Sequence, residues 1–387
     1  MSLARWIATL LCLGVVGSGM ACRRAAEQNE FRVGLYTSLT GGTATFGRSA
    51  HNGVKLASEE INTRGGVLGR PVNLIVEDDQ GKPEEAKLAV LKLIRQHKVT
   101  AILGEVASSR TLAAAPEAQR TKIPMLTPTS TNATVTKVGD YIFRACFIDS
   151  FQGGAMATFA RQELKVSKAA ILHDARSDYS VGLAEFFRKS FTRQGGEVLA
   201  DEAFAEGDVD FRAQLVAIQA KQPEAIFIPG YYTEVGLIAR QARELGITAT
   251  LLGTDGWDSP KTLEIAGPAL EGSYFSNHYA ADDPSPLVHQ FITTYQARFG
   301  QIPDAIAALS YDAAHLLFDA TQRAGKVDST KIRDALAATK GFPGVAGAIT
   351  IDRERNAEKP IVIIKIAHGA FVFDRRITDV ATISKGP

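Results

Sequence analysis

Short apolar runs alternate with amphipathic segments along most of the first 270 residues. The run at residues 31–36 predicts a strand, and the next segment carries apolar side chains at spacings of four, four, three and four. Such spacing places one apolar face on a helix. The residues of this face are Phe46, Ala50, Val54, Ala57 and Ile61. The pair Gly65-Gly66 ends the helix, because glycine accepts the backbone conformation of a helix stop.

The strand and helix order then repeats in two series. The expected strands are 31–36, 72–76, 101–104 and 123–126, then 169–173, 198–203, 225–229 and 250–253. Helical segments lie between them, and this alternation is typical of a parallel sheet covered by helices on both faces. Gly195-Gly196 repeats the helix stop of the first series 130 positions later. We therefore expect two lobes of one architecture.

After residue 276 the pattern changes to helices, followed by short strand-like runs. The expected helices are 286–299, 304–324 and 329–338, and the expected strands are 348–351, 360–367 and 371–373. A block of this size is too short for a third domain, so it is expected to complete the first two. The prediction is an α/β fold with two doubly wound parallel-sheet lobes joined by a multi-crossover hinge. The lobes are 31–147 with 277–353 and 148–276 with 354–387, and hinge segments are expected at 147–150, 273–277 and 352–356. Open α/β sheets bind ligands at the carboxyl ends of their strands, so a cleft between the lobes is the expected site.

The first 21 residues follow the plan of an export signal. Arg5 precedes an apolar run at 6–16, and small residues follow at 17–19. The run is about half the ~20 residues that a membrane-spanning helix needs. The sequence GMAC at 19–22 resembles a bacterial lipobox, which predicts a lipid anchor on Cys22. Ordinary cleavage after Ala21, which leaves a plain thiol, is the alternative.

Composition and charge narrow the function further. The chain has 387 residues, of which 45% are hydrophobic and 22% charged, and this excludes a disordered chain. Lys and Arg number 43 against 42 Asp and Glu, so no basic surface for nucleic acid is expected. Removal of residues 1–21 takes away Arg5 alone and leaves the exported chain formally neutral. Of the three cysteines, Cys146 alone lies beyond residue 22, so no intramolecular disulfide is expected in the body of the protein. Cys146 is expected to be a buried free thiol.

Motifs of common enzymes are missing from the sequence. There is no Walker A motif, no G-x-G-x-x-G after a strand and no G-x-S-x-G elbow. The seven histidines form no H-x-x-x-H pair and no Cys/His set with metal-ligand spacing. We therefore predict no catalytic residue, no metal and no cofactor. An exported α/β hydrolase remains the least favoured class.

Hydroxyl side chains gather where two neighbouring strands of the first series end. Ser108 and Ser109 follow the strand at 101–104 and open a helix, and Thr129, Ser130 and Thr131 follow the strand at 123–126. Hydroxyls and free backbone N–H groups at such a place bind anions. Neither segment contains Lys or Arg, which suits a carboxylate better than a phosphate. Helix capping and an ordinary turn are the alternative for either segment alone.

The second series carries the complementary chemistry at its strand ends. Tyr231 follows the strand at 225–229, and Asp255 and Trp257 follow the strand at 250–253. A carboxylate flanked by aromatic rings suits an ammonium group. An anion site on one lobe and an ammonium site on the other describe a zwitterionic amino acid, although Asp255 alone could be a turn residue.

Several ordered motifs resemble the leucine/isoleucine/valine-binding proteins, the type I periplasmic binding components of ABC importers. The motifs are VGLYTSLTGGTATFG at 33–47, NTRGGVLG at 62–69, GEVASS at 104–109, DSFQG at 149–153 and QARELG at 241–246. The resemblance runs from about Phe31 almost to the C-terminus. It implies this fold and function for the whole exported chain.

The resemblance also implies individual roles. Ser108 and Thr131 would hold the ligand carboxylate with the backbone of Thr129. Tyr231 and Asp255 match the family's ammonium positions. Two further matches are aromatic: Tyr179 at a position of the closed cleft and Phe46 at a side-chain wall position that is often Tyr. Asp255 stands where branched-chain binders commonly have Glu, and the family's disulfide is absent because Gly81 and Ala107 occupy its places.

Our leading hypothesis is a non-enzymatic, lipid-tethered, monomeric receptor outside the cytoplasmic membrane, in the periplasm or on the outer cell surface. Its lobes would close over an amino acid, possibly a branched one, and present it to an ABC permease. Because Trp257 is the only tryptophan beyond the signal, its fluorescence is expected to report binding. The alternative is the same fold binding an amide, urea or an aromatic acid, for transport or for sensing.

Overall fold

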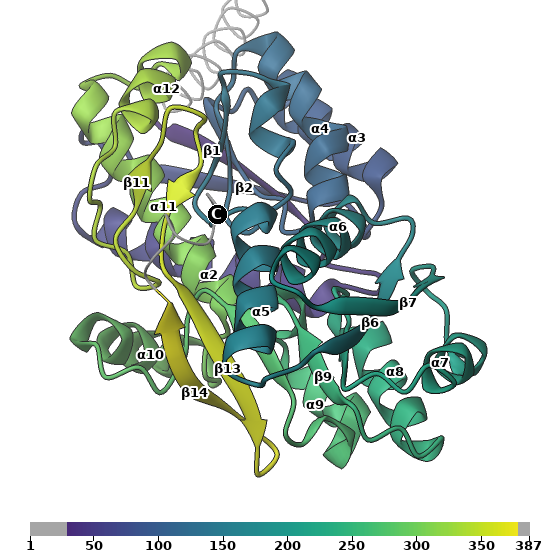
Figure 1. Cartoon of the computed structure of the whole chain (residues 1–387). Helices are drawn as coiled ribbons and strands as arrows, with labels where there is room; N and C mark the ends of the chain where they lie inside the picture. Colours follow the sequence, from purple (N-terminus) through teal and green to yellow (C-terminus); the bar gives the residue numbers. More distant parts are fainter. Residues whose placement is uncertain (1–28, 378–387) are drawn as a thin grey trace, which may run out of the picture.

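The computed structural model describes residues 29–377 and contains two large sheets (Figure 1). The first sheet has the order β2-β1-β3-β4-β5, and all of its strands are parallel. Its strands are β1 (Phe31–Thr37), β2 (Val72–Asp78), β3 (Ala101–Leu103), β4 (Met125–Thr127) and β5 (Ile142–Arg144). The predicted signal at 1–21 and Cys22 lie outside the described residues.

The second sheet has the order β14-β13-β10-β9-β8-β6-β7. Its parallel strands are β6 (Lys168–Asp174), β7 (Glu197–Phe204), β8 (Ala225–Phe227), β9 (Thr250–Gly253) and β10 (Tyr274–Asn277). The hairpin of β13 (Ile361–Ala367) and β14 (Ala370–Ile377) adds an antiparallel edge next to β10. Figure 1 shows this hairpin in yellow at the edge of the lower sheet. The predicted fold class is confirmed.

Helices cover both faces of each sheet because the strand side chains alternate between the faces. In β1, Val33 and Leu35 pack with residues of α2 and α11, whereas Tyr36 packs with residues of α3 and α4. In β6, Ala170 and Leu172 face the layer of α7, α8 and α9, and the residues between them face α5 and α6. The helices that cover the first sheet are α2 (Ala44–Thr63), α3 (Pro83–Arg95), α4 (Ser108–Thr121), α11 (Ala305–Ala324) and α12 (Ser329–Ala337). Those of the second are α5 (Asp149–Gln162), α6 (Asp178–Arg193), α7 (Arg212–Gln219), α8 (Tyr232–Glu244) and α9 (Pro260–Ala266).

Within the described residues the chain passes between the two sheets in three places. These are the segment from β5 to α5, the segment from β10 to α10 (Pro286–Phe299), and the segment around β11 (Thr350–Ile351) and β12 (Ala357–Glu358). The C-terminal block thus supplies α11 and α12 to the first sheet and β13 and β14 to the second. The bounds of the two lobes themselves stay a prediction.

Among the element boundaries that differ from the sequence prediction, two have a local reason. The apolar spacing predicts a helix over 181–193, but α6 begins at Asp178, because the side chain of Ser177 accepts a hydrogen bond from Ser180 N and caps it. Strand β14 continues to Ile377, well beyond the predicted 371–373. Its second half carries Asp374, Arg375 and Arg376, and these polar residues do not give the apolar pattern that predicts a strand. The segment is a strand because it pairs with β13.

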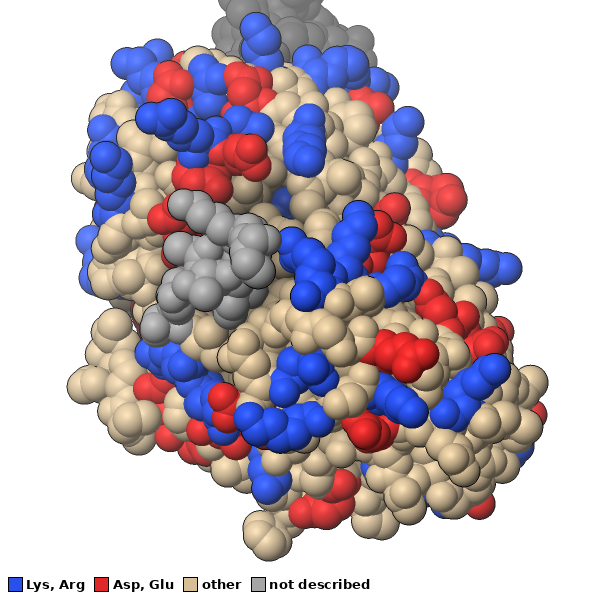
Figure 2. All heavy atoms as spheres, in the orientation of Figure 1, with Lys and Arg blue, Asp and Glu red and all other residues tan. Residues whose placement is uncertain are grey.

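The described surface carries both signs of charge. Figure 2 shows Lys and Arg interspersed with Asp and Glu on one face of the molecule. Among residues 29–377 no helix is long and apolar enough to cross a membrane.

Candidate functional site

A small cavity lies where strand ends of the two sheets meet. Its lining comes from both sheets and from α2 and α11, and consists of Phe46, Val106, Thr129, Tyr179, Tyr231, Asp255, Gly256, Asn277, His278, Ala305, Ile306 and Leu309. About 20 Å³ of it is open to the centre of a water molecule. A free amino acid is larger than this space, so its entry requires the two sides to move apart.

Asp255 is the one carboxylate among the residues that line this cavity. It follows β9 and begins the short helix η2 (Asp255–Trp257). Its Oδ1 accepts hydrogen bonds from Gln152 Nε2 at 2.7 Å and from the Tyr179 hydroxyl at 2.7 Å. Its Oδ2 lies 3.2 Å from His278 Nε2, and the side chain is 11% exposed. The structure therefore holds a nearly buried acidic group in fixed orientation.

Aromatic rings form the wall beside Asp255. The rings of Tyr179 and Tyr231 stack with centroids 5.1 Å apart, and Phe46 meets Tyr231 edge to face at 5.8 Å. Burial raises the pKa of Tyr179 well above its usual value, so its hydroxyl stays protonated and donates to Asp255. Gly256 packs under this wall, where a Cβ would lie 2.5 Å from Gly230 O and 2.9 Å from the Tyr179 hydroxyl. Only glycine fits there without displacing the tyrosine.

The predicted hydroxyl residues lie on the opposite side, but they do not all face the cavity. Thr129 lines it, with Oγ1 donating to Val106 O at 3.0 Å. Ser108 Oγ accepts from Asn132 N at 3.1 Å. Thr131 is fully buried, and its Oγ1 makes no hydrogen bond of standard geometry among the described residues. Burial raises the pKa of the neighbouring Asp149, and Thr131 opposes this effect in part.

The other two predicted hydroxyls, those of Ser130 and Ser109, also make contacts within the protein. Ser130 Oγ donates to Glu105 O at 2.9 Å and contacts Thr111 Oγ1 at 2.6 Å, so it closes the turn between the strand ends. Ser109 Oγ accepts from Asp178 N at 2.9 Å. Because Asp178 begins α6, this bond joins the two sides of the cleft.

Trp257 lies apart from the cavity. Its side chain is fully buried in the core of the second sheet, where Nε1 donates to Ile228 O at 2.9 Å and the ring packs on Gly253. The expected contact of this ring with an ammonium group is not present in this arrangement. The reason is geometric, because η2 directs Asp255 to the cavity and turns Trp257 to the opposite side.

The sequence analysis did not identify several residues of the cavity. Asn277 is the last residue of β10 and His278 follows it, so a search of the strand ends for site residues would have identified both. Ile306 and Leu309 lie on α11, and Gln152, which is outside the lining but donates to Asp255, lies within α5, 150 or so residues away in sequence. No local pattern signals those contacts, because the chain crossing alone brings them to the cleft.

Additional bonds cross the cleft around the cavity. Asn132 Nδ2 donates to Asp178 O at 2.7 Å, and Thr233 Oγ1 donates to Gly42 O at 3.1 Å. Asp258 Oδ2 accepts from Ala305 N at 2.6 Å, deep in the interface. These bonds connect elements of the first sheet with elements of the second and describe a closed cleft.

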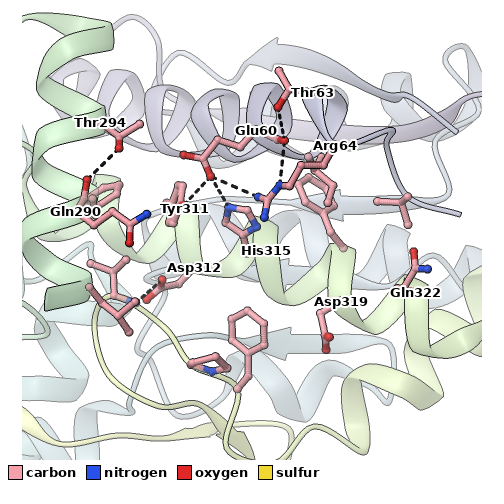
Figure 3. Close-up of a pocket in the computed structure, with 18 residues that line it drawn as sticks. Glu60, Thr63, Arg64, Gln290, Thr294, Tyr311, Asp312, His315, Asp319 and Gln322 are labelled. Carbon is pink, nitrogen blue, oxygen red and sulfur yellow. Dashed lines mark hydrogen bonds and ion pairs between the residues drawn. The ribbon is translucent and has the colours of Figure 1, made fainter. Parts of the chain in front are cut away.

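A larger cavity of about 710 Å³ lies between α2, α10, α11 and the loop at 342–345 (Figure 3). Glu60 accepts from the Tyr311 hydroxyl at 2.8 Å and lies 3.3 Å from His315 Nε2 and 3.6 Å from Arg64 Nη2. Figure 3 shows these three side chains converging on Glu60. Asp312 accepts from the backbone N–H of residues 345 and 346. Glu60 and Asp312 thus have partners within the protein. Asp255 also has partners, but it lines the cleft cavity as its one carboxylate.

The remaining sequence predictions concern cysteine and metal. Cys146 is a buried free thiol, as predicted, and burial raises the pKa of this thiol to about 12. No group of three or more His, Cys, Asp or Glu suited to a metal ion occurs in the described part of the chain.

Comparison with known proteins identifies relatives over nearly the whole described chain. The sequence profile of the periplasmic binding protein family matches residues 30–369. The leucine-binding protein LivK of Thermotoga maritima is 42% identical with a TM-score of 0.86, over 89% of this chain and 98% of that one. The branched-chain amino acid transporter substrate-binding protein LivJ of Streptococcus pneumoniae, solved with isoleucine, is 32% identical with a TM-score of 0.85, over 90% and 99%. A solute-binding protein of an ABC transporter from Rhodopseudomonas palustris BisB5, solved with 3,4-dihydroxybenzoic acid, is 28% identical with a TM-score of 0.80, over 90% and 97%.

Proposed function

The chain belongs to the periplasmic binding protein family, and from that premise we propose that it is the solute-binding protein of an ABC importer and binds an amino acid between its lobes. The observation that carries the proposal is Asp255, the single carboxylate of the cavity lining, held by neighbouring donors and facing the open space. A buried carboxylate without a cationic partner is costly. The ammonium group of an amino acid supplies that partner.

The opposite side of the cleft suits the carboxylate of the same ligand. Helix α4 begins at Ser108, so its free N–H groups and positive dipole end point toward the strand ends. Ser108, Thr129 and the buried hydroxyl of Thr131 lie at this place, and we assign the ligand carboxylate to them.

An apolar wall completes the site and selects the ligand side chain. Phe46, Val106, Ile306 and Leu309 line the cavity without an additional charge. An aliphatic side chain there would leave water and gain about 25 cal/mol for each Å² of apolar surface buried. Leucine, isoleucine and valine match this wall, and LivJ of S. pneumoniae, which shares the fold, was solved with isoleucine.

Transport requires opening and closing of the cleft. We assign the lobes to 31–147 with 277–353 and 148–276 with 354–387, and the hinge to the three segments that connect the sheets. The ligand bridges Asp255 on one lobe and the hydroxyl rim on the other, so it binds the closed form more tightly and shifts the equilibrium toward it. The closed form then docks on a membrane permease.

The remaining parts of the proposal concern location and assembly. The segment at 1–21 would direct export, and Cys22 would carry a lipid that holds the protein outside the cytoplasmic membrane. The protein would act as a monomer and without enzymatic activity, since its task is to carry the ligand unchanged.

Isothermal titration calorimetry of the purified protein against each of the twenty amino acids tests the function. The protein is first unfolded, dialysed and refolded so that no co-purified ligand remains. We expect saturable heat with leucine, isoleucine or valine and no heat with lysine or aspartate. Absence of saturable heat for every amino acid would contradict the proposal.

One neighbour supports a second candidate. The solute-binding protein of R. palustris was solved with an aromatic acid and shares the fold, so of the alternative ligands considered it supports an aromatic acid. Such ligands lack the ammonium group that Asp255 would pair with. Saturable heat with benzoate in the absence of heat with any amino acid would favour this candidate.

A further inference from the structure

His278 is the one histidine among the cavity-lining residues, and its side chain is 1% exposed. It follows β10, and its ring stacks on Phe147 with centroids 3.6 Å apart and an angle of 20° between the planes. Phe147 and His278 flank two of the segments through which the chain passes between the sheets. The ring therefore cannot rotate freely while the cleft is closed.

The contacts of Asp255 leave one acceptor position open. A carboxylate accepts about four hydrogen bonds, two on each oxygen. Oδ1 already accepts from Gln152 Nε2 and from the Tyr179 hydroxyl. Within residues 29–377, Oδ2 contacts only His278 Nε2, at 3.2 Å. The free position is thus on Oδ2, next to the imidazole.

This contact defines the protonation of His278. An ionised carboxylate only accepts hydrogen bonds, so Nε2 carries the hydrogen. Nδ1 is then the deprotonated nitrogen, and it is buried without a hydrogen-bond partner among the described residues. A proton added to Nδ1 would have no acceptor. Burial accordingly lowers the pKa of His278, although the contact with Asp255 acts in the opposite direction.

The charged groups around the ring are few. Asp255 lies in direct contact, and Lys359, on the segment before β13, acts on the ring from farther away and lowers its pKa. Gln152 and Phe147 carry no charge. Asp149 and Cys146 act on their own neighbours and contribute little to the imidazole.

We propose that His278 positions Asp255 for the ammonium group and releases the ligand when it gains a proton. As a neutral imidazole it fixes Oδ2 and leaves the pair with a net charge of −1, which attracts an ammonium group. As an imidazolium it makes the pair neutral and places a positive charge beside the ammonium group of the ligand. This inference rests on the proposed function, since it concerns the same site.

The direction of the pH dependence follows. Ligand binding favours the deprotonated ring, so affinity is constant above the pKa of the free protein's imidazole and falls below it. An ordinary histidine titrates near 6.5, and burial moves this value down. For one proton the loss is at most about tenfold for each pH unit. Affinity is therefore expected to be constant at neutral and higher pH and to fall as the pH is lowered through the titration of the free protein's imidazole.

Calorimetric titration with the amino acid that binds best, from pH 5 to pH 8, tests the proposal with the wild type, His278→Gln and His278→Phe. The Gln amide can place a donor where Nε2 lies but does not titrate. We expect His278→Gln to bind more tightly than His278→Phe at pH 7.5 and to lose the fall in affinity at low pH. We expect His278→Phe, which removes the donor, to bind at least about tenfold more weakly at pH 7.5.

Different results contradict different claims. If the wild type binds an amino acid and His278→Gln shows the same pH profile, the role of His278 is wrong while the proposed function holds. If no amino acid binds at any pH, the proposed function fails. The ring can be examined without any variant, by ¹⁵N NMR of histidine-labelled wild-type protein. The proposal expects the hydrogen on Nε2 at pH 7.5, and a hydrogen on Nδ1 would overturn it.

Discussion

At the scale of single residues, the buried charges and their partners decide what the protein can bind. Asp255 is held by neutral donors, so its negative charge is available to a ligand. By contrast, Arg144 is fully buried and donates to the carbonyl oxygens of Ser130 and Asn132 at 2.8 and 2.7 Å. It therefore fixes the loop after β4 and is turned away from the ligand.

Asp255→Asn tests the ammonium contact. The amide keeps the size of the side chain but removes the charge, so affinity for the amino acid should fall at least about 100-fold, because an ammonium would be buried without a counter-charge. Calorimetry measures the loss. Asp334→Asn is the matched control, since Asp334 is exposed and pairs with Arg333 on the surface. Equal affinities of the two variants would exclude the ammonium role of Asp255.

A second buried carboxylate predicts a pH effect on stability. Asp79 Oδ1 accepts from Ser38 Oγ at 2.8 Å and from Gly81 N at 2.9 Å. Burial, together with the nearby Glu105, raises the pKa of Asp79 to about 8, against the lowering effect of Arg110. Between about pH 4 and pH 8 the folded state thus keeps a proton that the unfolded state has lost. The contribution of Asp79 to stability therefore decreases as the pH rises through this range.

Asp79→Asn should reduce this pH dependence. The amide does not titrate, so the unfolding free energy of the variant should decrease less steeply than that of the wild type between pH 5 and pH 8. The two slopes should differ by at most about 1.4 kcal/mol for each pH unit. Urea unfolding at several pH values measures both slopes. An unchanged slope would mean that Asp79 is already ionised in the folded protein.

At the scale of elements, close packing of helices limits which residues the sequence can use. Helices α2 and α11 cover the same face of the first sheet and supply Phe46, Ile306 and Leu309 to the cavity. Gly53 lies at their contact, where a Cβ would lie 2.3 Å from Ala307 O and 3.0 Å from Tyr311 N. The helices can approach to this distance because Gly53 has no side chain.

Gly53→Ala should destabilise the protein despite the better helix propensity of alanine. The propensity favours alanine by about 1 kcal/mol, whereas overpacking against backbone costs about 1–3 kcal/mol. We expect a net loss of up to about 2 kcal/mol in urea unfolding. Gly42→Ala is the control, because a Cβ there has no neighbour within 4 Å. A Gly53→Ala variant as stable as the control would show that α2 and α11 move apart at little cost.

At the scale of the whole molecule, bonds across the cleft contribute to affinity without touching the ligand. Ser109 Oγ accepts from Asp178 N, which begins α6 on the other side. Because the hydroxyl of Ser109 is engaged in this bond across the cleft, we assign Ser109 to closure. The ligand carboxylate is left to Ser108, Thr129 and Thr131.

Ser109→Ala should weaken amino-acid binding by about 2- to 10-fold, the effect of one hydrogen bond. The loss should appear as faster dissociation in surface plasmon resonance, with little change in the association rate, because the bond forms only on closure. Ser285→Ala, a change before α10 that removes no side-chain cap, is the control. A slower association rate with unchanged dissociation would contradict a closure role.

The sequence predicted the regular parts of the molecule well and the cavity only in part. Alternating apolar runs are local signals, so the order of strands and helices, the parallel sheets and the residues at strand ends could be predicted. Asp255, Tyr231 and Thr129 follow strands and do line the cavity. The orientation of side chains within those loops was not predictable, since one turn of η2 separates Asp255 in the cavity from Trp257 in the core.

By itself the sequence determined the fold class, the family and the presence of an acidic group and hydroxyl groups at the strand ends, because each depends on residues near one another in the chain. Only the tertiary structure decided which of these side chains face one cavity. Tyr179, His278 and Leu309 reach it from α6, from the end of β10 and from α11. They meet because the chain passes between its two sheets three times within the described residues, and no local pattern of hydrophobic and polar residues records such a meeting.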